Sequence, residues 1–386
     1  MNHADFQFEI YRAGLCDGPP RYPVDVAGLQ QAAREALDDS AYWYVAGSCG
    51  TGDTAAANCA AFGRWRIVPR MLRAADVRDL RTELFGRTYP TPLVLAPVGV
   101  QSIVHPEGDL ATARAAASLG IPMTLSTAGS FSIEEVAEVA GPRWYQLYWP
   151  HDDEVTLSLL ERAAKAGYET LVVTLDTWTL GWRPHDLNRA YLPFLRGNGL
   201  ATPFSDPVFR SRLERPVEED VRAAIEAWIP MFNGRAHTWP ELALLRDNWD
   251  GPIVLKGIQH VDDALRAVDA GMDGIVVSNH GGRQIDGAVA SLDALPGIVA
   301  AASDRLSVLF DSGVRSGSDV FKALALGARA VLLGRPYVWG LATGGEAGVR
   351  QVVRSLLAEL DLTLGLAGFV SPAELDPSVL VKAEPR

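Results

Sequence analysis

Eight short apolar runs, separated by longer segments, restrict the fold of this chain more than any other feature. Several of the intervening segments are rich in alanine and end on Gly or Gly-Ala, as helices often do. Alternation of strands and helices predicts a parallel sheet, and eight repeats over roughly 250 residues predict an α/β fold of the (β/α)8 barrel type. A doubly wound open sheet is the alternative. The runs are PLVLAPVG (92–99), PMTLSTAG (122–129), RWYQLYW (143–149), TLVVTLD (170–176), PIVLKG (252–257), GIVVSNH (274–280), SVLFDSG (307–313) and AVLLGRP (330–336).

The ends of these runs are polar, although the runs themselves are apolar. Barrel enzymes collect their catalytic side chains at the C-terminal ends of the strands, whereas an open sheet concentrates them at one switch point. Candidates at nearly every strand end therefore favour a catalytic barrel. They are Gln101, Ser126, Thr127, Gln146, Tyr148, Thr174, Asp176, Lys256, Ser278, His280, Asp311 and Arg335.

Two parts of the chain lie outside the repeat. We expect one domain over residues 1–386, with an N-terminal cap at 1–90, a barrel at 91–345 and a C-terminal helix and tail at 346–386. The cap contains one helical stretch, VAGLQQAAREALDDSAYWYVAG. The segment at about 182–248 is too long for a simple connection after the fourth strand, and it includes a predicted helix, EEDVRAAIEAW. Such an insertion over the C-terminal face suits an active-site lid or an oligomer contact.

The acidic balance of the chain excludes several partners. Lys and Arg number 35 against 47 Asp and Glu, for a net charge of −12, which disfavours nucleic acid and anionic membranes. No segment approaches the roughly 20 apolar residues of a membrane helix, and we expect no secretory signal at the N-terminus. Three cysteines without CxxC spacing suit a reducing cytoplasm. We therefore expect a soluble cytoplasmic protein.

The motif SNHGGRQ (278–284) predicts an anion site. His280 at a strand end can exchange a proton near neutral pH, and Arg283 can bind a carboxylate with two hydrogen bonds. Asp176 could orient the histidine, and Arg183 could be a second carboxylate ligand. The alternatives are a structural histidine with a surface arginine, and a lid salt bridge for Arg183. Tyr148 could bind a substrate oxygen or be a packed barrel aromatic.

A lysine and two Gly/Arg loops complete the candidates. Lys256 after a buried strand must pair with an anion or lose its charge, so it could form a Schiff base or hold negative charge on a cofactor. Loops after the last two strands of a barrel commonly bind phosphate, and here they contain Gly313, Arg315, Gly334 and Arg335. No HExxH or Cys/His ligand spacing is present, so no metal is expected, and the absence of GxGxxG argues against a nicotinamide site.

Together these motifs resemble the FMN-dependent L-2-hydroxy-acid oxidases and dehydrogenases over nearly the whole chain. The similarity is carried by SNHGGRQ, LDTWTLGWR, YQLYW, VLKGI, LAPVG, FDSGVRSGSDVFKALALGA and LLGRP. Within the family, FEIYRAGL, LAPVG, LPFLRG and DPVF are most similar to lactate 2-monooxygenase. In glycolate oxidase a glycine stands where this chain has Ser312, and in several oxidases an alanine stands where it has Gly99, which could admit a larger substrate.

The resemblance implies a role for each site residue. It makes His280 the proton acceptor supported by Asp176, and Lys256 the cation beside the N1 side of the flavin. Substrate contacts would be Tyr44, Tyr148, Arg183, His280 and Arg283, of which Tyr148 and Arg283 would also assist catalysis. FMN contacts would be Pro97, Val98, Gly99, Ser126, Gln146, Thr174, Lys256 and Ser278, with the phosphate among Asp311, Gly313, Arg315, Gly334 and Arg335.

These roles predict an enzyme that oxidises a small L-2-hydroxy acid with oxygen, namely lactate 2-monooxygenase, which gives acetate, CO2 and water. A lactate or mandelate-type oxidase that releases keto acid and hydrogen peroxide is the first alternative. A flavin-binding barrel without catalysis is an alternative from another class. The expected partners are the substrate and oxygen, and the expected assembly is a homotetramer or octamer.

Overall fold

Eight parallel strands close into a barrel, as the sequence predicted, so the open-sheet alternative is wrong. The structure, a computed structural model, describes residues 2–16 and 18–383. The barrel closes where β11 pairs with β4, Val331 opposite Leu93. Each barrel strand coincides with one of the predicted apolar runs, and only β8 extends past its run, by the single residue Ile258. The strands are β4 (Leu93–Leu95), β5 (Met123–Ser126), β6 (Arg143–Leu147), β7 (Thr170–Thr174), β8 (Ile253–Ile258), β9 (Gly274–Val277), β10 (Ser307–Phe310) and β11 (Ala330–Leu333).

The interior of the barrel is a small apolar cluster, distinct from the larger core between strands and helices. Successive side chains of a strand point to opposite faces, so Trp144 faces inward while Tyr145 faces the helices. The inward cluster contains Val94, Trp144, Val172, Val254, Val276, Leu309, Ala330 and Leu332. Two residues beyond the cluster members of β6 to β10, the inward positions are polar: they are Gln146, Thr174, Lys256, Ser278 and Asp311.

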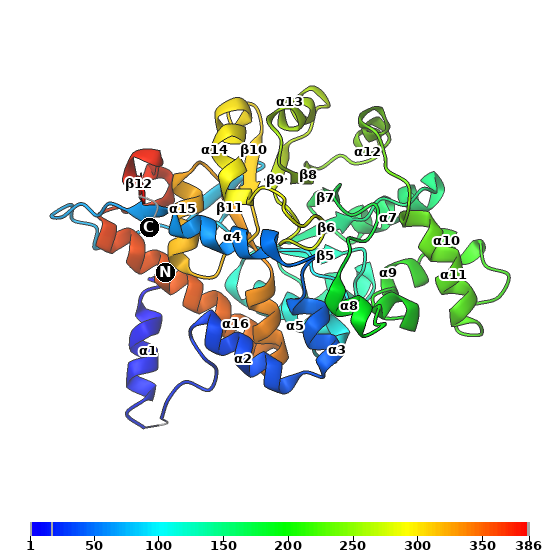
Figure 1. The fold of residues 1–386 in the computed structure, drawn as a ribbon, viewed down its shortest axis with the longest axis horizontal. Coiled ribbons are helices and arrows are strands. Elements are labelled where there is room, and N and C mark those ends of the chain that lie inside the picture. Colours follow the sequence, from blue (N-terminus) through cyan, green and yellow to red (C-terminus); the bar gives the residue numbers. More distant parts are fainter. Residues whose placement is uncertain (1, 17, 384–386) are drawn as a thin grey trace.

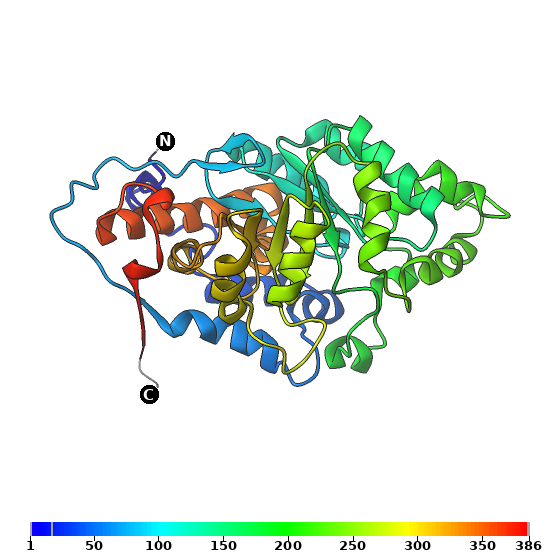
Figure 2. The same ribbon diagram turned by 90° about the horizontal axis from the view of Figure 1, so that it is seen from above.

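Helices surround the barrel (Figures 1 and 2). Local capping explains where several begin: Ser132 and Glu135 form a capping box on α6, and Asp152 accepts from the Val155 N–H on α7. Helix α16 has non-helical backbone at Gly344 and Gly345, which separates the last barrel helix from a C-terminal helix. The helices are α5 (Gly108–Leu119), α6 (Ile133–Val139), α7 (Asp153–Lys165), α13 (Val261–Asp269), α14 (Ser291–Ala302), α15 (Gly317–Ala325) and α16 (Arg335–Ala367).

The N-terminal cap contains four helices where the sequence predicted one helical stretch, and two of them, α1 and α4, lie outside that stretch. The stretch at 26–47 is two helices, because Leu37 is extended and the Asp38 carboxylate caps a new helix. The cap helices are α1 (Asp5–Ala13), α2 (Val26–Ala36), α3 (Asp39–Ala46) and α4 (Asp53–Gly63). Strand β1 (Trp65–Ile67) pairs with β12 (Leu380–Lys382) at the far end of the chain.

A hairpin closes the N-terminal end of the barrel. It consists of β2 (Thr82–Leu84) and β3 (Arg87–Tyr89). Its Phe85 and Tyr89 rings lie 5.9 and 6.4 Å from the ring of Trp144, and Leu84 joins the same interior cluster. The open end is therefore the C-terminal end.

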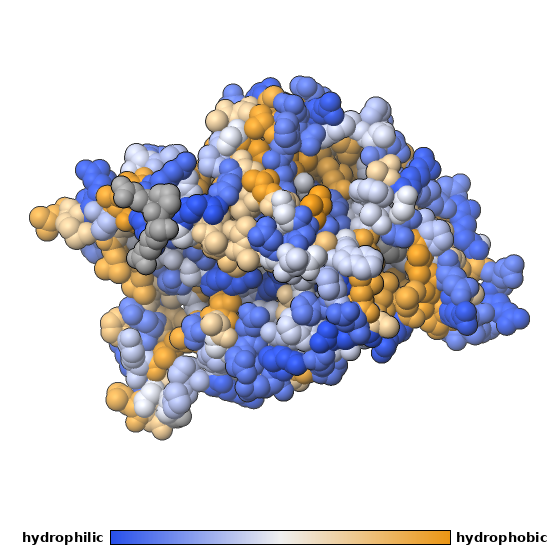
Figure 3. All heavy atoms as spheres, viewed as in Figure 1, coloured by the Kyte–Doolittle hydropathy of each residue, from blue (hydrophilic) through white to orange (hydrophobic). Residues whose placement is uncertain are grey.

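The insertion between β7 and β8, here called the lid, contains α11 (Val221–Phe232), which includes all but the first three residues of the predicted helix at 218–228. In both ribbon views α10 and α11 lie at the opposite end of the long axis from the two termini (Figures 1 and 2). The face seen in Figure 3 is mainly hydrophilic with scattered hydrophobic patches. Within the described ranges, no helix is both long and apolar enough to span a bilayer. The lid helices are α8 (Pro184–Asn188), α9 (Ala201–Phe204), α10 (Pro207–Ser211), α11 (Val221–Phe232) and α12 (Leu242–Asp247).

Candidate active site

A cavity opens at the C-terminal ends of the strands. Its empty volume is about 1340 Å³, part of which is open to solvent. The cap supplies Tyr44 and Val45, and the lid supplies Phe194, Leu200 and Trp228. Of the predicted site residues, these line it: Tyr44, Pro97, Val98, Gly99, Tyr148, Arg183, Lys256, His280, Arg283, Asp311, Gly313, Arg315, Gly334 and Arg335.

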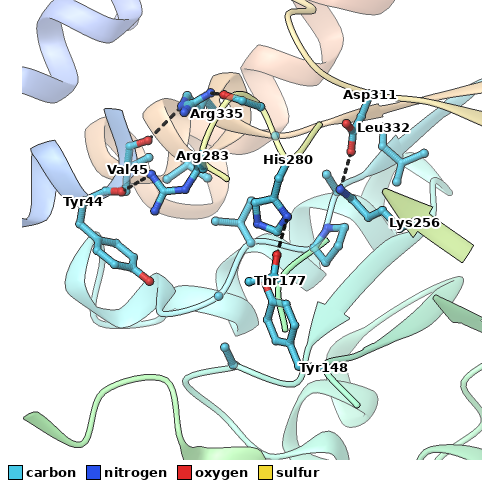
Figure 4. A pocket seen from close by; sticks show the side chains of 18 of the residues that line it. Tyr44, Val45, Tyr148, Thr177, Lys256, His280, Arg283, Asp311, Leu332 and Arg335 are labelled. Carbon is cyan, nitrogen blue, oxygen red and sulfur yellow. Dashed lines mark hydrogen bonds and ion pairs between the residues drawn. The ribbon is translucent and has the colours of Figure 1, made fainter. Parts of the chain in front are cut away.

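His280 lies between Lys256 on one side and the Tyr44–Arg283 group on the other (Figure 4). Its Nδ1 is 2.9 Å from Asp176 Oδ1 and 3.1 Å from Thr177 Oγ1. A carboxylate accepts, so Nδ1 carries the proton and Nε2 keeps its lone pair. His280 has a φ of 57°, a left-handed conformation that costs a non-glycine residue roughly 1–2 kcal/mol. Its N–H is 3.1 Å from Ser278 Oγ, which helps to hold that turn.

Burial sets the protonation of this pair. It lowers the pKa of His280 below the ordinary value, although Asp176 acts in the opposite direction. Burial also opposes ionisation of Asp176, but the charges of His280 and Lys256 and a hydrogen bond from Thr177 outweigh it and lower the pKa of Asp176. The resting pair is a neutral imidazole beside a carboxylate, which can accept one proton.

Two guanidinium groups lie beside the histidine, those of the buried Arg183 and the partly buried Arg283. Arg283 donates to the carbonyls of Tyr44 and Gly47 at 2.7 and 3.0 Å, and lies 5.2 Å from the Tyr44 ring centre. Burial and the charge of Arg183 lower the pKa of Arg283 to about 10, so Arg283 stays charged at neutral pH. Burial raises the pKa of Tyr44 and of Tyr148, which keeps both phenols as donors. The group can bind a carboxylate and a neighbouring oxygen.

Lys256 is held as a cation deep in the cavity. Its Nζ is 2.9 Å from both Asp311 Oδ2 and Ser278 Oγ, and the residue is 4% exposed. Burial lowers the pKa of Lys256, but the charges of Asp311 and Asp176 outweigh it and raise the pKa above the ordinary value. A Schiff base needs a neutral amine, so the geometry favours the alternative in which this lysine stabilises negative charge.

The remaining predicted residues lie one step deeper or behind the histidine: Ser126, Gln146, Thr174 and Ser278 are buried, and Asp176 is partly buried. Ser126 donates to Gln146 Oε1 at 2.8 Å, while Gln146 Nε2 has no hydrogen-bond partner among the described residues. Thr174 and Asp176 border a second cavity beyond Tyr148. A buried amide donor without a partner, next to a ring of polar side chains, is suited to the polar edge of a planar cofactor.

At the ends of β10 and β11, one expected phosphate ligand has other partners. All three guanidinium nitrogens of Arg335 donate at 3.0 Å to backbone carbonyls, those of Val45, Gly47 and Gly281. Burial lowers the pKa of Arg335 to about 9. The side chain therefore ties the cap to the barrel, and its contact with a phosphate stays a prediction. Gly334 borders open space where a side chain would point, which leaves room for a ligand.

The suggestion that Gly99 enlarges the substrate space is wrong. A Cβ at this position would lie 2.7 Å from the Cβ of Ala128 and 2.9 Å from its carbonyl oxygen. The position is a close contact between two strand-end loops, reinforced by the hydrogen bond from the Val100 N–H to the Ala128 carbonyl. The glycine is required by packing.

Several residues of the site were not anticipated from the sequence. Thr177 bridges Asp176 and His280, and its only sequence signal is its position beside Asp176. Asn58 and Asn279 exchange amide hydrogen bonds of 2.7 and 2.8 Å that dock α4 on the catalytic loop. The lid residues Phe194, Leu200 and Trp228 give the cavity an apolar wall. Trp228 has helical spacing with the buried Ala224 and Ile225 of α11, but that spacing predicts packing and not a place in a site. Phe194 and Leu200 show no such spacing.

Comparisons with known proteins agree with this geometry. Residues 33–382 match the FMN-dependent dehydrogenase family. An FMN-dependent alpha-hydroxy acid dehydrogenase of Penicillium citrinum is 50% identical, covering 97% of this chain and 94% of the relative. An L-lactate oxidase of Lysinibacillus sphaericus is 41% identical, covering 94% of this chain and 93% of the relative. A crystal structure of mandelate oxidase with (S)-4-hydroxymandelic acid has a TM-score of 0.83 at 41% identity, covering 94% of this chain and 99% of that chain.

Proposed function

Because the chain belongs to the FMN-dependent dehydrogenase family, we propose that it oxidises an L-2-hydroxy acid and passes the electrons to oxygen. One observation carries the proposal: a neutral His280, with Nδ1 bonded to Asp176, lies beside the buried Arg183 and the partly buried Arg283. A base next to a carboxylate-binding group is what this oxidation requires.

The residues present fit FMN. Lys256 and the unpartnered Gln146 Nε2 would hold the polar edge of the ring, and the loops at Gly313 and Gly334 would receive the phosphate. Bound FMN supplies the acceptor for the two electrons of the substrate. The lysine is already charged before any ligand arrives, so stabilisation of negative charge on the cofactor needs no rearrangement.

The proton and the substrate are handled by the chain itself. Arg183 and Arg283 bind the carboxylate, which fixes the α-carbon relative to the histidine. The Tyr148 hydroxyl donates to the α-oxygen. His280 Nε2 then takes a proton from the substrate, and the Asp176 carboxylate stabilises the imidazolium that results.

As substrate we propose L-lactate, with the keto acid retained and converted to acetate as in lactate 2-monooxygenase. The lid over the cavity supports retention, because slow opening can limit product release. The second candidate is an oxidase acting on mandelate-type acids, favoured by the apolar wall of Phe194, Leu200 and Trp228. We also propose a cytoplasmic homotetramer or octamer, which light scattering of the purified protein would test.

The test is a product analysis. The FMN-loaded protein is given L-lactate or (S)-mandelate in air, and acetate, keto acids and peroxide are quantified together. Acetate without peroxide supports the monooxygenase, and equal keto acid and peroxide supports the oxidase. Absence of flavin reduction by either acid under anaerobic conditions would contradict the proposed function.

A further inference from the structure

Gln284, the last residue of the SNHGGRQ motif, connects the catalytic loop to two other parts of the site. Its Nε2 donates to the carbonyls of Asp176 and Thr179 at 2.6 and 2.8 Å. Its Oε1 accepts from Arg183 Nη2 at 2.8 Å and from the Gly181 N–H at 3.3 Å. Both faces of the amide are thus used, and only this orientation matches donors with acceptors.

The backbone around Gln284 is fixed by the cap. The Cys49 thiol lies 3.2 Å from the Gln284 carbonyl, and Thr54 Oγ1 donates to the Ile285 carbonyl at 2.9 Å. On the other side Gly181 approaches so closely that a Cβ there would lie 2.5 Å from the Gln284 carbonyl oxygen. The backbone that bears the side-chain amide is therefore contacted from both sides.

Arg183 needs such support because of its neighbour. It is 6% exposed, and burial together with the positive charge of Arg183 lowers the pKa of Arg283. Two contacts hold its guanidinium plane, Nε to the Arg283 carbonyl at 3.1 Å and Nη2 to Gln284. A neutral amide orients the group without cancelling its charge, whereas a carboxylate there would pair with it and compete with the substrate carboxylate.

We propose that Gln284 is a positioning residue: it holds the guanidinium group of Arg183 in the orientation that binds the substrate carboxylate. The inference rests on the proposed function. It predicts that loss of the amide weakens binding of carboxylates and leaves the proton transfer to His280 largely intact.

The experiment measures binding apart from turnover. In Gln284→Met, the dissociation constant of oxalate, followed by the FMN absorbance change, and the KM for L-lactate should both rise about tenfold or more, as for loss of one hydrogen bond to a charged group. FMN content and kcat should stay close to the wild-type values. Gln284→Glu should also weaken oxalate binding. If the methionine variant does not bind FMN, the oxalate measurement is made on Gln284→Glu instead. Gln31→Met, at an exposed position on α2, is the matched control.

A double-mutant cycle with Arg183→Met identifies the route of the effect. If Gln284 acts through Arg183, the double variant should bind oxalate no more weakly than Arg183→Met alone. The inference would be overturned if the two substitutions weakened oxalate binding by factors that multiply in the double variant. It would also be overturned if Gln284→Met lowered kcat and left oxalate binding unchanged. Either outcome would leave the proposed function in place. A wild-type protein that neither binds oxalate nor reduces its flavin with a 2-hydroxy acid would overturn both.

Discussion

The two ends of the barrel interior are built from the same strands but have opposite characters. At the N-terminal end the inward side chains are apolar, with Trp144 packed on Phe85 and Tyr89 of the hairpin. At the C-terminal end the next inward positions are polar or charged, as at Lys256 and Asp311. One end forms an apolar core, and the other holds buried charges next to a cavity. The side chains that stabilise the barrel and those that face the cavity therefore lie only two positions apart on the same strands. A substitution at one end should affect stability, and a substitution at the other should affect activity.

The largest expected effect is at the polar end. His280→Ala should lower the rate of anaerobic flavin reduction by the substrate by at least ~10²–10⁴-fold, the usual effect of removing a general base. FMN content and the unfolding midpoint should change little, because the side chain contributes to the cavity and not to the core. Stopped-flow absorbance measures the rate. Reduction at the wild-type rate would contradict the role of this histidine.

The apolar end should respond in the opposite way. Trp144→Ala should lower the free energy of unfolding by about 3–5 kcal/mol, since the residue is fully buried and leaves a cavity. Urea denaturation followed by circular dichroism measures the change. The pH dependence of kcat/KM in the folded fraction should match that of the wild-type protein. A shifted pH profile would show that the two ends are not independent.

The activity of the polar end should also depend on pH. The folded enzyme needs neutral His280, so kcat/KM should fall as pH drops through the pKa of His280, which burial places below its ordinary value. Asp176 raises that pKa, so Asp176→Asn should move the acid limb to lower pH and also reduce the plateau rate. Asp262→Asn, on the exposed side of α13, should leave the limb in place. If the acid limb of the kcat/KM profile moved to higher pH in Asp176→Asn, the pairing of Asp176 with His280 would be contradicted.

The smallest expected effect concerns a buried carboxyl outside the site. Burial raises the pKa of Asp109 to about 7, and its Oδ1 has no partner among the described residues. The folded state then binds a proton that the unfolded state has lost, so this group's contribution to stability falls as pH rises from about 4 to 7. Asp109→Asn can still accept from the Ser130 N–H. Its thermal midpoint relative to wild type should therefore rise between pH 5.5 and pH 8, and a constant difference would refute the shifted pKa.

The barrel and most of the residues that face the cavity could be predicted from the sequence. Strand runs are short and local, side chains alternate with a period of two, and a polar residue after such a run must lie at a strand end. These local rules are enough to place Lys256, His280 and Asp311 at one end of the barrel. The same rules failed at 26–47, because one extended residue, Leu37, interrupts a pattern that reads as continuous helix.

The interaction partners of these residues could be identified only in the tertiary structure. Asn58 meets Asn279 across 221 positions, and Arg335 donates to the Val45 carbonyl across 290. Gly99 faces Ala128 rather than a substrate, and Gln284 faces Arg183. Such contacts depend on how the cap and lid dock on the barrel, which is a matter of shape and of matching donors with acceptors between distant segments. No local periodicity encodes that matching, so a side chain's position could be predicted from the sequence while its partner could not.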